Sequence, residues 1–208
     1  KQQLLLTNKR VDWGFKQSVQ AAQLRIEKQM EQEHKQVLLV SSTLPQEGKS
    51  MTAVNLALAF MQHEKKTVLI DGDLRKPSVA EMLGMEEQKG LAEYLKGNAK
   101  VKEVLQKKGD LTVIQGGKVH GNISSLMDES RMEELMTFLK SEFDYVIIDT
   151  PPAYLFSDAA ILAGYADCVL YVVRHDMAEI PQIEKGMESF IQEDKLLGYL
   201  INRSQKGF

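Results

Sequence analysis

One stretch, from Val37 to Ser50, most constrains how this chain can fold. Its first four residues are apolar and predict a buried strand. A polar turn that ends in Gly48-Lys49-Ser50 follows, and residues 51–60 predict a helix. A strand, a loop with Gly-Lys-Ser and a helix are the context of a phosphate-binding Walker A loop. The inward N–H groups of such a loop and the positive end of its helix attract anions.

The match to the strict Walker A pattern is incomplete, because Thr43 stands where the pattern has its first glycine. Taken alone, Gly-Lys-Ser is also compatible with a turn that caps an ordinary helix. If the loop binds a nucleotide, Lys49 supplies a charge for the outer phosphates and the Ser50 hydroxyl can ligate Mg²⁺. Two later segments favour this interpretation.

Acidic residues follow two further apolar runs. Residues 67–70 lead into Asp71-Gly72-Asp73, and residues 145–148 lead into Asp149-Thr-Pro-Pro. Ligands of parallel α/β sheets bind at the carboxyl ends of strands, so we expect these acids to lie near the phosphate loop. Asp149 has the layout of a Walker B acid, which orients Mg²⁺ and its water. Asp71 is either a metal-side or phosphate-side acid or the cap of the next segment in a solvated turn.

The composition is that of a soluble globular protein, with 208 residues, 43% hydrophobic and 26% charged. A net charge of −3 gives no general field for nucleic acid, so no nucleic-acid partner is expected. The single cysteine, Cys168, excludes an intramolecular disulfide, and the four histidines have no ligand spacing. No run is long enough to span a membrane and no signal peptide is recognised, which predicts a cytoplasmic location.

Six predicted strands alternate with helices, which is typical of an α/β fold with a mostly parallel sheet and helices on both faces. Residues 1–35 form an N-terminal arm and a helix capped by Asp12, and residues 36–208 form the nucleotide-binding domain. The strands are expected at 37–40, 67–70, 111–114, 145–148, 168–173 and 197–201. A helical region over 124–142 is expected to place Met127, Met132, Leu135, Met136 and Leu139 in the core.

The three strand-end segments together predict binding of ATP with Mg²⁺. At this point the sequence resembles the bacterial protein-tyrosine kinases of capsule and exopolysaccharide assembly, over roughly Gln17 to Arg203. The most specific match is the Walker A′ segment Val68-Leu-Ile-Asp-Gly-Asp-Leu-Arg75. The wider relatives are the MinD/ParA-type ATPases, which carry a second lysine where Leu44 stands, so its absence favours the kinases.

The resemblance implies roles for the matched residues. The loop amides and Lys49 bind the phosphates, Ser50, Asp71 and Asp149 serve the metal, and Asp71 accepts or orients the proton of the acceptor hydroxyl. Asp73 lies on the acceptor side, and Arg75 either stabilises developing charge or forms a surface ion pair. Asn202 and Arg203 resemble the element that recognises adenine. The phosphate-binding loop comprises Pro45, Gln46, Glu47, Gly48, Lys49, Ser50, Met51 and Thr52.

The resemblance also implies partners, namely a membrane-bound polysaccharide co-polymerase that activates the kinase and a tyrosine-containing protein substrate. It places the protein at the inner face of the cell membrane. Gln17, Gln20 and Gln23 stand where the family carries a charged Glu-x-x-Arg-x-x-Arg motif for ring assembly, which puts a homo-oligomeric ring in doubt. The chain ends without the family's tyrosine cluster, and Tyr199, inside a predicted strand, is expected to be a poor acceptor.

Two alternatives to a tyrosine kinase stay open. One is a MinD/ParA-like ATPase whose hydrolysis switches dimer or partner contacts. The other is a nucleotide-binding regulatory module with little catalysis. All three predict nucleotide binding, so binding alone does not separate them.

Overall fold

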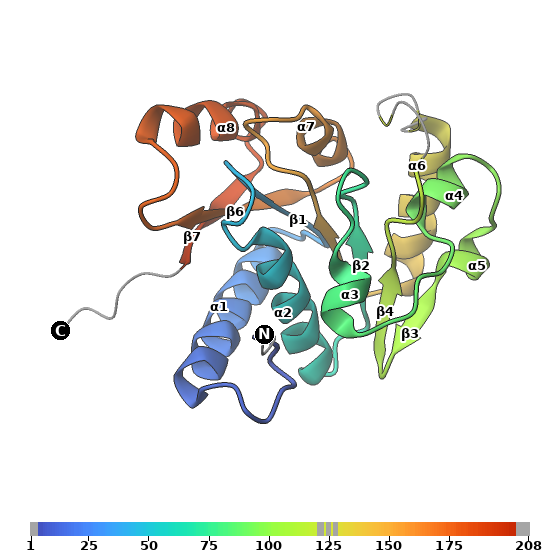
Figure 1. The fold of residues 1–208 in the computed structure, drawn as a ribbon, viewed down its shortest axis with the longest axis horizontal. Coiled ribbons are helices and arrows are strands. Elements are labelled where there is room, and N and C mark those ends of the chain that lie inside the picture. Colours follow the sequence, from blue (N-terminus) through green and yellow to red (C-terminus); the bar gives the residue numbers. More distant parts are fainter. Residues whose placement is uncertain (1–3, 120–122, 124–125, 127–128, 203–208) are drawn as a thin grey trace.

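In the described part of the chain, the fold is one seven-stranded sheet covered by helices on both faces (Figure 1). The structure is a computed structural model that describes residues 4–119, 123, 126 and 129–202. The spatial order of the strands is β3-β4-β2-β5-β1-β6-β7, and all pairs are parallel except β3 with β4. The strands are β1 (Val37–Ser42), β2 (Thr67–Asp71), β3 (Gln106–Lys108), β4 (Leu111–Ile114), β5 (Tyr145–Asp149), β6 (Cys168–Arg174) and β7 (Leu196–Asn202).

Two groups of helices cover the sheet. Apolar residues of α1, α2 and α3 pack in one core layer, and those of α4 to α8 pack in the other. The helices are α1 (Trp13–Gln32), α2 (Lys49–Gln62), α3 (Val79–Leu83), α4 (Leu91–Leu95), α5 (Val101–Val104), α6 (Glu129–Glu142), α7 (Asp158–Ala163) and α8 (Ile180–Gln192). None of the helices in the described part of the chain combines the length and the apolar character that crossing a lipid bilayer requires.

The predicted α/β class is confirmed, and the predicted count of six strands is wrong by one. The extra strand, β3, is short, lies at the sheet edge and runs antiparallel to β4. Its sequence, Gln-Lys-Lys, has no apolar periodicity, so no strand signal precedes its pairing with β4. The expected core residues of α6, Met132 to Leu139, are buried, while Met127 lies outside the described residues.

The N-terminal helix α1 packs against α2, and Asp12 caps it as predicted by accepting a hydrogen bond from the Phe15 N–H. Ile26 and Met30 of α1 join the core layer that α2 forms with the sheet. The preceding arm is attached as well, because Leu6 is buried and its N–H donates to the Asn55 side chain of α2.

The three glutamines of α1 differ in exposure. Gln17 is exposed and Gln20 is half-buried, whereas Gln23 is fully buried and donates to the carboxylate of Glu27. The side chain of Gln23 is thus enclosed by the molecule itself, and the correspondence of the three glutamines to the family's charged motif stays a prediction.

Candidate functional site

The loop between β1 and α2 has the backbone of a phosphate-binding loop. Gln46 and Gly48 adopt left-handed conformations, with φ of +67° and +97°, and α2 begins immediately afterwards at Lys49. A Cβ atom at Gly48 would lie 2.1 Å from the side-chain nitrogen of Asn202, so only glycine fits here. Residues 45–48 form the loop that precedes α2, and residues 49–52 form the first turn of that helix, which begins two residues earlier than the sequence predicts.

Hydrogen bonds from residues of β6 stabilise this loop. The buried carboxylate of Glu47 accepts hydrogen bonds from the backbone N–H groups of Leu44, at 2.6 Å, and Arg174, at 3.3 Å. The buried hydroxyl of Tyr171 donates to the Thr43 hydroxyl at 3.1 Å. Thr43 thus has a structural partner where a strict Walker A loop has glycine. Neither Tyr171 nor Arg174 belongs to a recognisable motif, so no local pattern pointed to these contacts.

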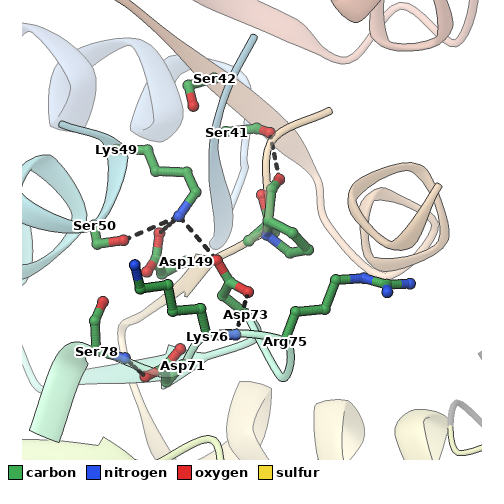
Figure 2. A network of polar contacts seen from close by, with 12 residues as sticks. Ser41, Ser42, Lys49, Ser50, Asp71, Asp73, Arg75, Lys76, Ser78 and Asp149 are labelled. Carbon is green, nitrogen blue, oxygen red and sulfur yellow. Dashed lines mark hydrogen bonds and ion pairs between the residues drawn. The ribbon is translucent and has the colours of Figure 1, made fainter. Parts of the chain in front are cut away.

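Beyond the carboxyl ends of β1, β2 and β5, the ammonium of Lys49 lies between the carboxylates of Asp73 and Asp149, as Figure 2 shows. The ammonium of Lys49 lies 3.1 Å from Asp73 Oδ2, 3.1 Å from Ser50 Oγ and 3.8 Å from Asp149 Oδ1. Asp71 lies on the strand next to β5, in register with Asp149. The structure therefore brings together the acids and the lysine that the sequence placed at three separate strand ends.

Asp71 caps the segment that follows it, which is one of the two functions that the sequence allowed, but its side chain is buried. Its Oδ2 atom accepts hydrogen bonds from the N–H groups of Ser78, at 2.9 Å, and Val79, at 3.0 Å, at the start of α3. Its Oδ1 atom is buried and has no hydrogen-bond partner among the described residues. Burial raises the pKa of Asp71 to about 7, and the nearby charge of Asp149 acts in the same direction. The expectation of a solvated turn at this position is wrong.

Asp149 is fully buried at the end of β5, and neither of its carboxylate oxygens has a hydrogen-bond partner within the described chain. Burial raises its pKa to about 6, although the charge of Lys49 opposes this shift. A buried carboxylate without donors is costly unless a cation or water meets it. The arrangement therefore suits a site whose acids are completed by a ligand.

The residues present fit a nucleotide-bound Mg²⁺ better than a metal held by protein alone. Within the described residues, no three histidine, cysteine or acidic side chains form a direct metal-binding group. Mg²⁺ is usually bound through one or two carboxylates together with phosphates and water. Ser50 Oγ and the carboxylate oxygens of Asp149, which accept no hydrogen bond from the described residues, are oxygen ligands of this kind beside the phosphate loop.

One predicted site residue, Asn202, lies in different surroundings from those expected. Asn202 is the last residue of β7 rather than part of the following loop, and its side-chain N–H donates to the Glu47 carbonyl at 2.8 Å. This bond joins β7 to the phosphate loop and uses one of the two N–H donors of the amide. Recognition of adenine by Asn202 stays a prediction. Arg203 lies outside the described residues.

Arg75 forms an ion pair, but its partner is buried rather than on the surface. Its guanidinium contacts both carboxylate oxygens of Asp158 at the start of α7. A contact between residues 83 positions apart has no local sequence signal, so no pattern pointed to Asp158 as the partner. Figure 2 shows the Arg75 side chain extending away from Lys49.

Comparison with known proteins gives the family of this chain. The chain is 36% identical over 168 residues to the tyrosine-protein kinase YwqD of Bacillus subtilis, a match that covers 79% of this chain and 71% of YwqD. This chain belongs to the family of bacterial tyrosine-protein kinases. Residues 33–163 also match the ParA family model described as NUBPL iron-transfer P-loop NTPase, which agrees with the wider relationship expected from the sequence. The protein is thus a nucleotide-binding P-loop NTPase.

Solved structures agree with this assignment. The chimerical protein CapA2B2 superimposes with a TM-score of 0.91 at 27% identity, covering 99% of this chain and 92% of that one. A longer relative, the tyrosine-protein kinase ptk of Acinetobacter johnsonii, is 30% identical over 173 residues. That match covers 82% of this chain but 24% of ptk, so the kinase-like domain is about a quarter of the longer relative.

Proposed function

We propose that this protein is an ATP-dependent protein-tyrosine kinase domain. The proposal is carried by one observation, the buried cluster in which Lys49 faces Asp73 and Asp149 at the amino end of α2. Phosphoryl transfer depends on positioning and on charge neutralisation rather than on a covalent enzyme intermediate. Phosphoryl transfer of this kind uses a phosphate-binding loop, a lysine and acidic side chains, and this cluster contains all three. Membership of the kinase family supports tyrosine as the acceptor.

In the proposed reaction, the loop amides and Lys49 bind the β- and γ-phosphates of ATP. Ser50 and Asp149 hold Mg²⁺, Asp149 through water, and the bound ion neutralises phosphate charge. Asp71 accepts the proton of the tyrosine hydroxyl. The phenolic oxygen forms a bond to the γ-phosphorus while the bond to the β-phosphate oxygen breaks, and ADP leaves. Asp71 suits this function because a general base works best with a pKa near the working pH, and its pKa is about 7.

There is space beside Asp71 for an acceptor side chain. A cavity of about 460 Å³ lies between α3 and the segment after β4. Its lining includes Asp71, Pro77, Met85 and Lys118. A mixed apolar and charged lining of this kind suits an aromatic ring with a polar end. This cavity therefore supports an approach of the acceptor from the side of α3.

The proposal extends to partners and location. By resemblance to the family, the domain works with a membrane-bound polysaccharide co-polymerase and acts on tyrosine-containing proteins at the inner face of the cell membrane. In this view it regulates capsule or exopolysaccharide synthesis. Residues 36–208 form the kinase domain, and residues 1–35 are the candidate oligomerisation element, in which Gln17, Gln20 and Gln23 replace the charged motif of the family's ring.

A MinD/ParA-like ATPase switch is the second candidate, favoured by the match to the ParA model. Leu44 occupies the position of the second lysine of that group, and its N–H is bonded to the Glu47 carboxylate. The loop therefore presents no second cation at that position. ATP-dependent dimerisation with phosphate release, in the absence of phosphotyrosine, would favour the switch over the kinase.

The decisive experiment is detection of phosphotyrosine by intact mass and antibody after incubation with ATP and Mg²⁺. The reaction contains a tyrosine-rich acceptor peptide, and is run with and without the cytoplasmic segment of a co-polymerase. We expect phosphotyrosine that depends on Lys49, so Lys49→Met abolishes it while ordered secondary structure is retained. Bound ATP without any phosphotyrosine, with the activating segment present, would contradict the proposal.

A further inference from the structure

The bond between Arg75 and Asp158 joins a partly exposed guanidinium to a buried carboxylate. Arg75 Nε lies 2.5 Å from Asp158 Oδ2, and Nη2 lies 3.2 Å from Oδ1, so the pair is bidentate. Asp158 is 1% exposed. The guanidinium carbon also lies 4.3 Å from the centre of the Phe156 ring, which covers it. The ion pair with Asp158 raises the pKa of Arg75, so its charge is secured.

Arg75 belongs to the turn that presents Asp73 to the phosphate loop. Asp73 Oδ1 accepts a hydrogen bond from the Lys76 N–H at 3.0 Å, which closes the turn around Arg75. Asp73 Oδ2 is the atom that contacts Lys49. Any movement of Arg75 is therefore transmitted to the acid that faces the catalytic lysine.

The segment that carries Asp158 is hydrogen-bonded to β1, the strand beside β5 in the sheet. Thr150 Oγ1 donates to the Val40 carbonyl at 3.0 Å, and the Ala153 N–H donates to the Ser42 carbonyl at 2.8 Å. Val40 and Ser42 lie on β1, the strand that ends in the phosphate loop. Arg75 thus connects the turn that contains Asp73 to a segment that is itself hydrogen-bonded to β1.

We propose that Arg75 and Asp158 are positioning residues that hold Asp73 opposite Lys49 during phosphoryl transfer. This inference rests on the proposed kinase function. Both side chains act through the turn, and the Arg75 guanidinium is occupied by Asp158 rather than by phosphate. Since small displacements of charged groups reduce transfer rates steeply, the pair acts on kcat more than on nucleotide binding.

The alternative suggested by the sequence, direct stabilisation of phosphate charge by Arg75, makes a different prediction for Asp158. If Arg75 contacted phosphate, Asp158→Asn would release the guanidinium and leave the rate intact or increased. If the pair positions the turn, Arg75→Ala and Asp158→Asn break the same bond and have equal consequences. A double-mutant cycle separates these cases.

The experiment measures kcat and KM for ATP in wild type, Arg75→Ala, Asp158→Asn and the double variant. We expect kcat to fall about 10- to 100-fold in each single variant, KM to change less than about 3-fold, and the double variant to be no slower than the slower single one. Arg75→Lys keeps the charge, loses the bidentate bond and is expected to recover part of the rate. Wild-type rates in Asp158→Asn, or additive losses in the double variant, would overturn the proposal.

Amide hydrogen exchange over residues 73–78 tests the same pair without any kinase reaction. We expect faster exchange in Arg75→Ala, Asp158→Asn and Arg75→Lys, because a turn that loses its attachment opens more often. Glu188→Gln is the matched control, since it breaks an exposed ion pair with Lys185 on α8. Unchanged exchange in the folded Arg75→Lys variant overturns the positioning. If the wild type shows no phosphotransfer, the proposed kinase function is contradicted. The hydrogen-exchange measurement still tests the positioning of the turn in that case.

Discussion

The ammonium of Lys49 lies 3.1 Å from the Asp73 carboxylate, at the point where the phosphate loop would present this lysine to an anion. Both side chains are largely shielded from solvent, so the attraction between them is screened less than at the surface. An incoming phosphate therefore competes with Asp73 for Lys49. This competition, together with the burial of the neighbouring acids, leads to four predictions.

The first prediction concerns the competition itself. In Asp73→Asn, Lys49 loses an anionic partner and the phosphates meet one negative charge fewer, so ADP measured without Mg²⁺ should bind about 3- to 10-fold more tightly. Phosphotransfer should nevertheless fall, because Lys49 loses its fixed orientation. Isothermal titration calorimetry with ADP in the presence of a chelator measures the affinity. Unchanged or weaker binding would show that the contact does not oppose nucleotide entry.

A second prediction assigns the acceptor-side function to Asp71. Asp71→Asn keeps an oxygen that can accept the Ser78 and Val79 hydrogen bonds, but it cannot take a proton. We expect kcat for phosphotransfer to fall about 100-fold or more, with the affinity for ATP changed less than about 3-fold. Single-turnover kinetics and nucleotide titration give the two values. Equal losses in both would contradict a function in proton transfer.

The third prediction is a fall in stability toward alkaline pH. The pKa of Asp71 is raised to about 7 and that of Asp149 to about 6, above the ordinary value of 3.8. At pH values between the ordinary pKa of 3.8 and these raised pKa values, the folded state keeps protons that the unfolded chain releases. The free energy of unfolding therefore falls as pH rises through this window, by about 1.4 kcal/mol per pH unit for each group that stays fully protonated.

Thermal unfolding in a chelator at about pH 5.5 and about pH 8 tests this sign. The melting temperature should be lower at the higher pH, and Asp71→Asn should reduce the difference. The opposite shift comes from carboxyl groups with lowered pKa, such as Asp167, whose stabilisation is lost only below the ordinary carboxyl range. A melting temperature that rises between the two pH values would contradict the expected protonation of the buried acids.

The fourth prediction tests the close approach of β2 and β5 beneath the acids. A Cβ atom at Gly72 would lie 2.6 Å from the Asp149 carbonyl and 2.9 Å from Leu162 Cδ1. We expect Gly72→Ala to lower the free energy of unfolding by about 1–3 kcal/mol, because the backbone must shift to relieve the overlap. Gly198→Ala is the matched control, since a Cβ atom there would meet no described atom within 4 Å and alanine is favoured over glycine in strands. Urea unfolding of both variants measures the difference, and equal stabilities would argue against the steric explanation.

Much of the fold follows from local patterns. Each of the six expected strands is present, because short runs rich in apolar and β-branched residues favour the strands of a sheet that helices cover. The same patterns placed Lys49, Asp71 and Asp149 at strand ends, and parallel pairing then brings those ends to one edge. The antiparallel strand β3 was missed because its polar residues acquire strand structure only by pairing with β4.

Exposure and side-chain partners were harder to predict. Tyr199 lies in a strand as expected, but β7 is at the edge of the sheet and leaves the tyrosine 67% exposed, so burial does not exclude it as an acceptor. Gln23 is enclosed because α1 packs onto α2. Neither outcome is encoded in the neighbouring residues, since each depends on which element lies alongside.

The phosphate loop, the acids at the strand ends and the order of most strands and helices can be predicted from the chain alone, because these features depend on local composition and spacing. Three features needed the folded molecule: Arg75 contacts Asp158, Asn202 and Glu47 hold the phosphate loop, and the Asp149 carboxylate has no hydrogen-bond donor among the described residues. Such contacts join residues far apart in the chain, and their geometry is fixed only when the strands align and the helices pack against them.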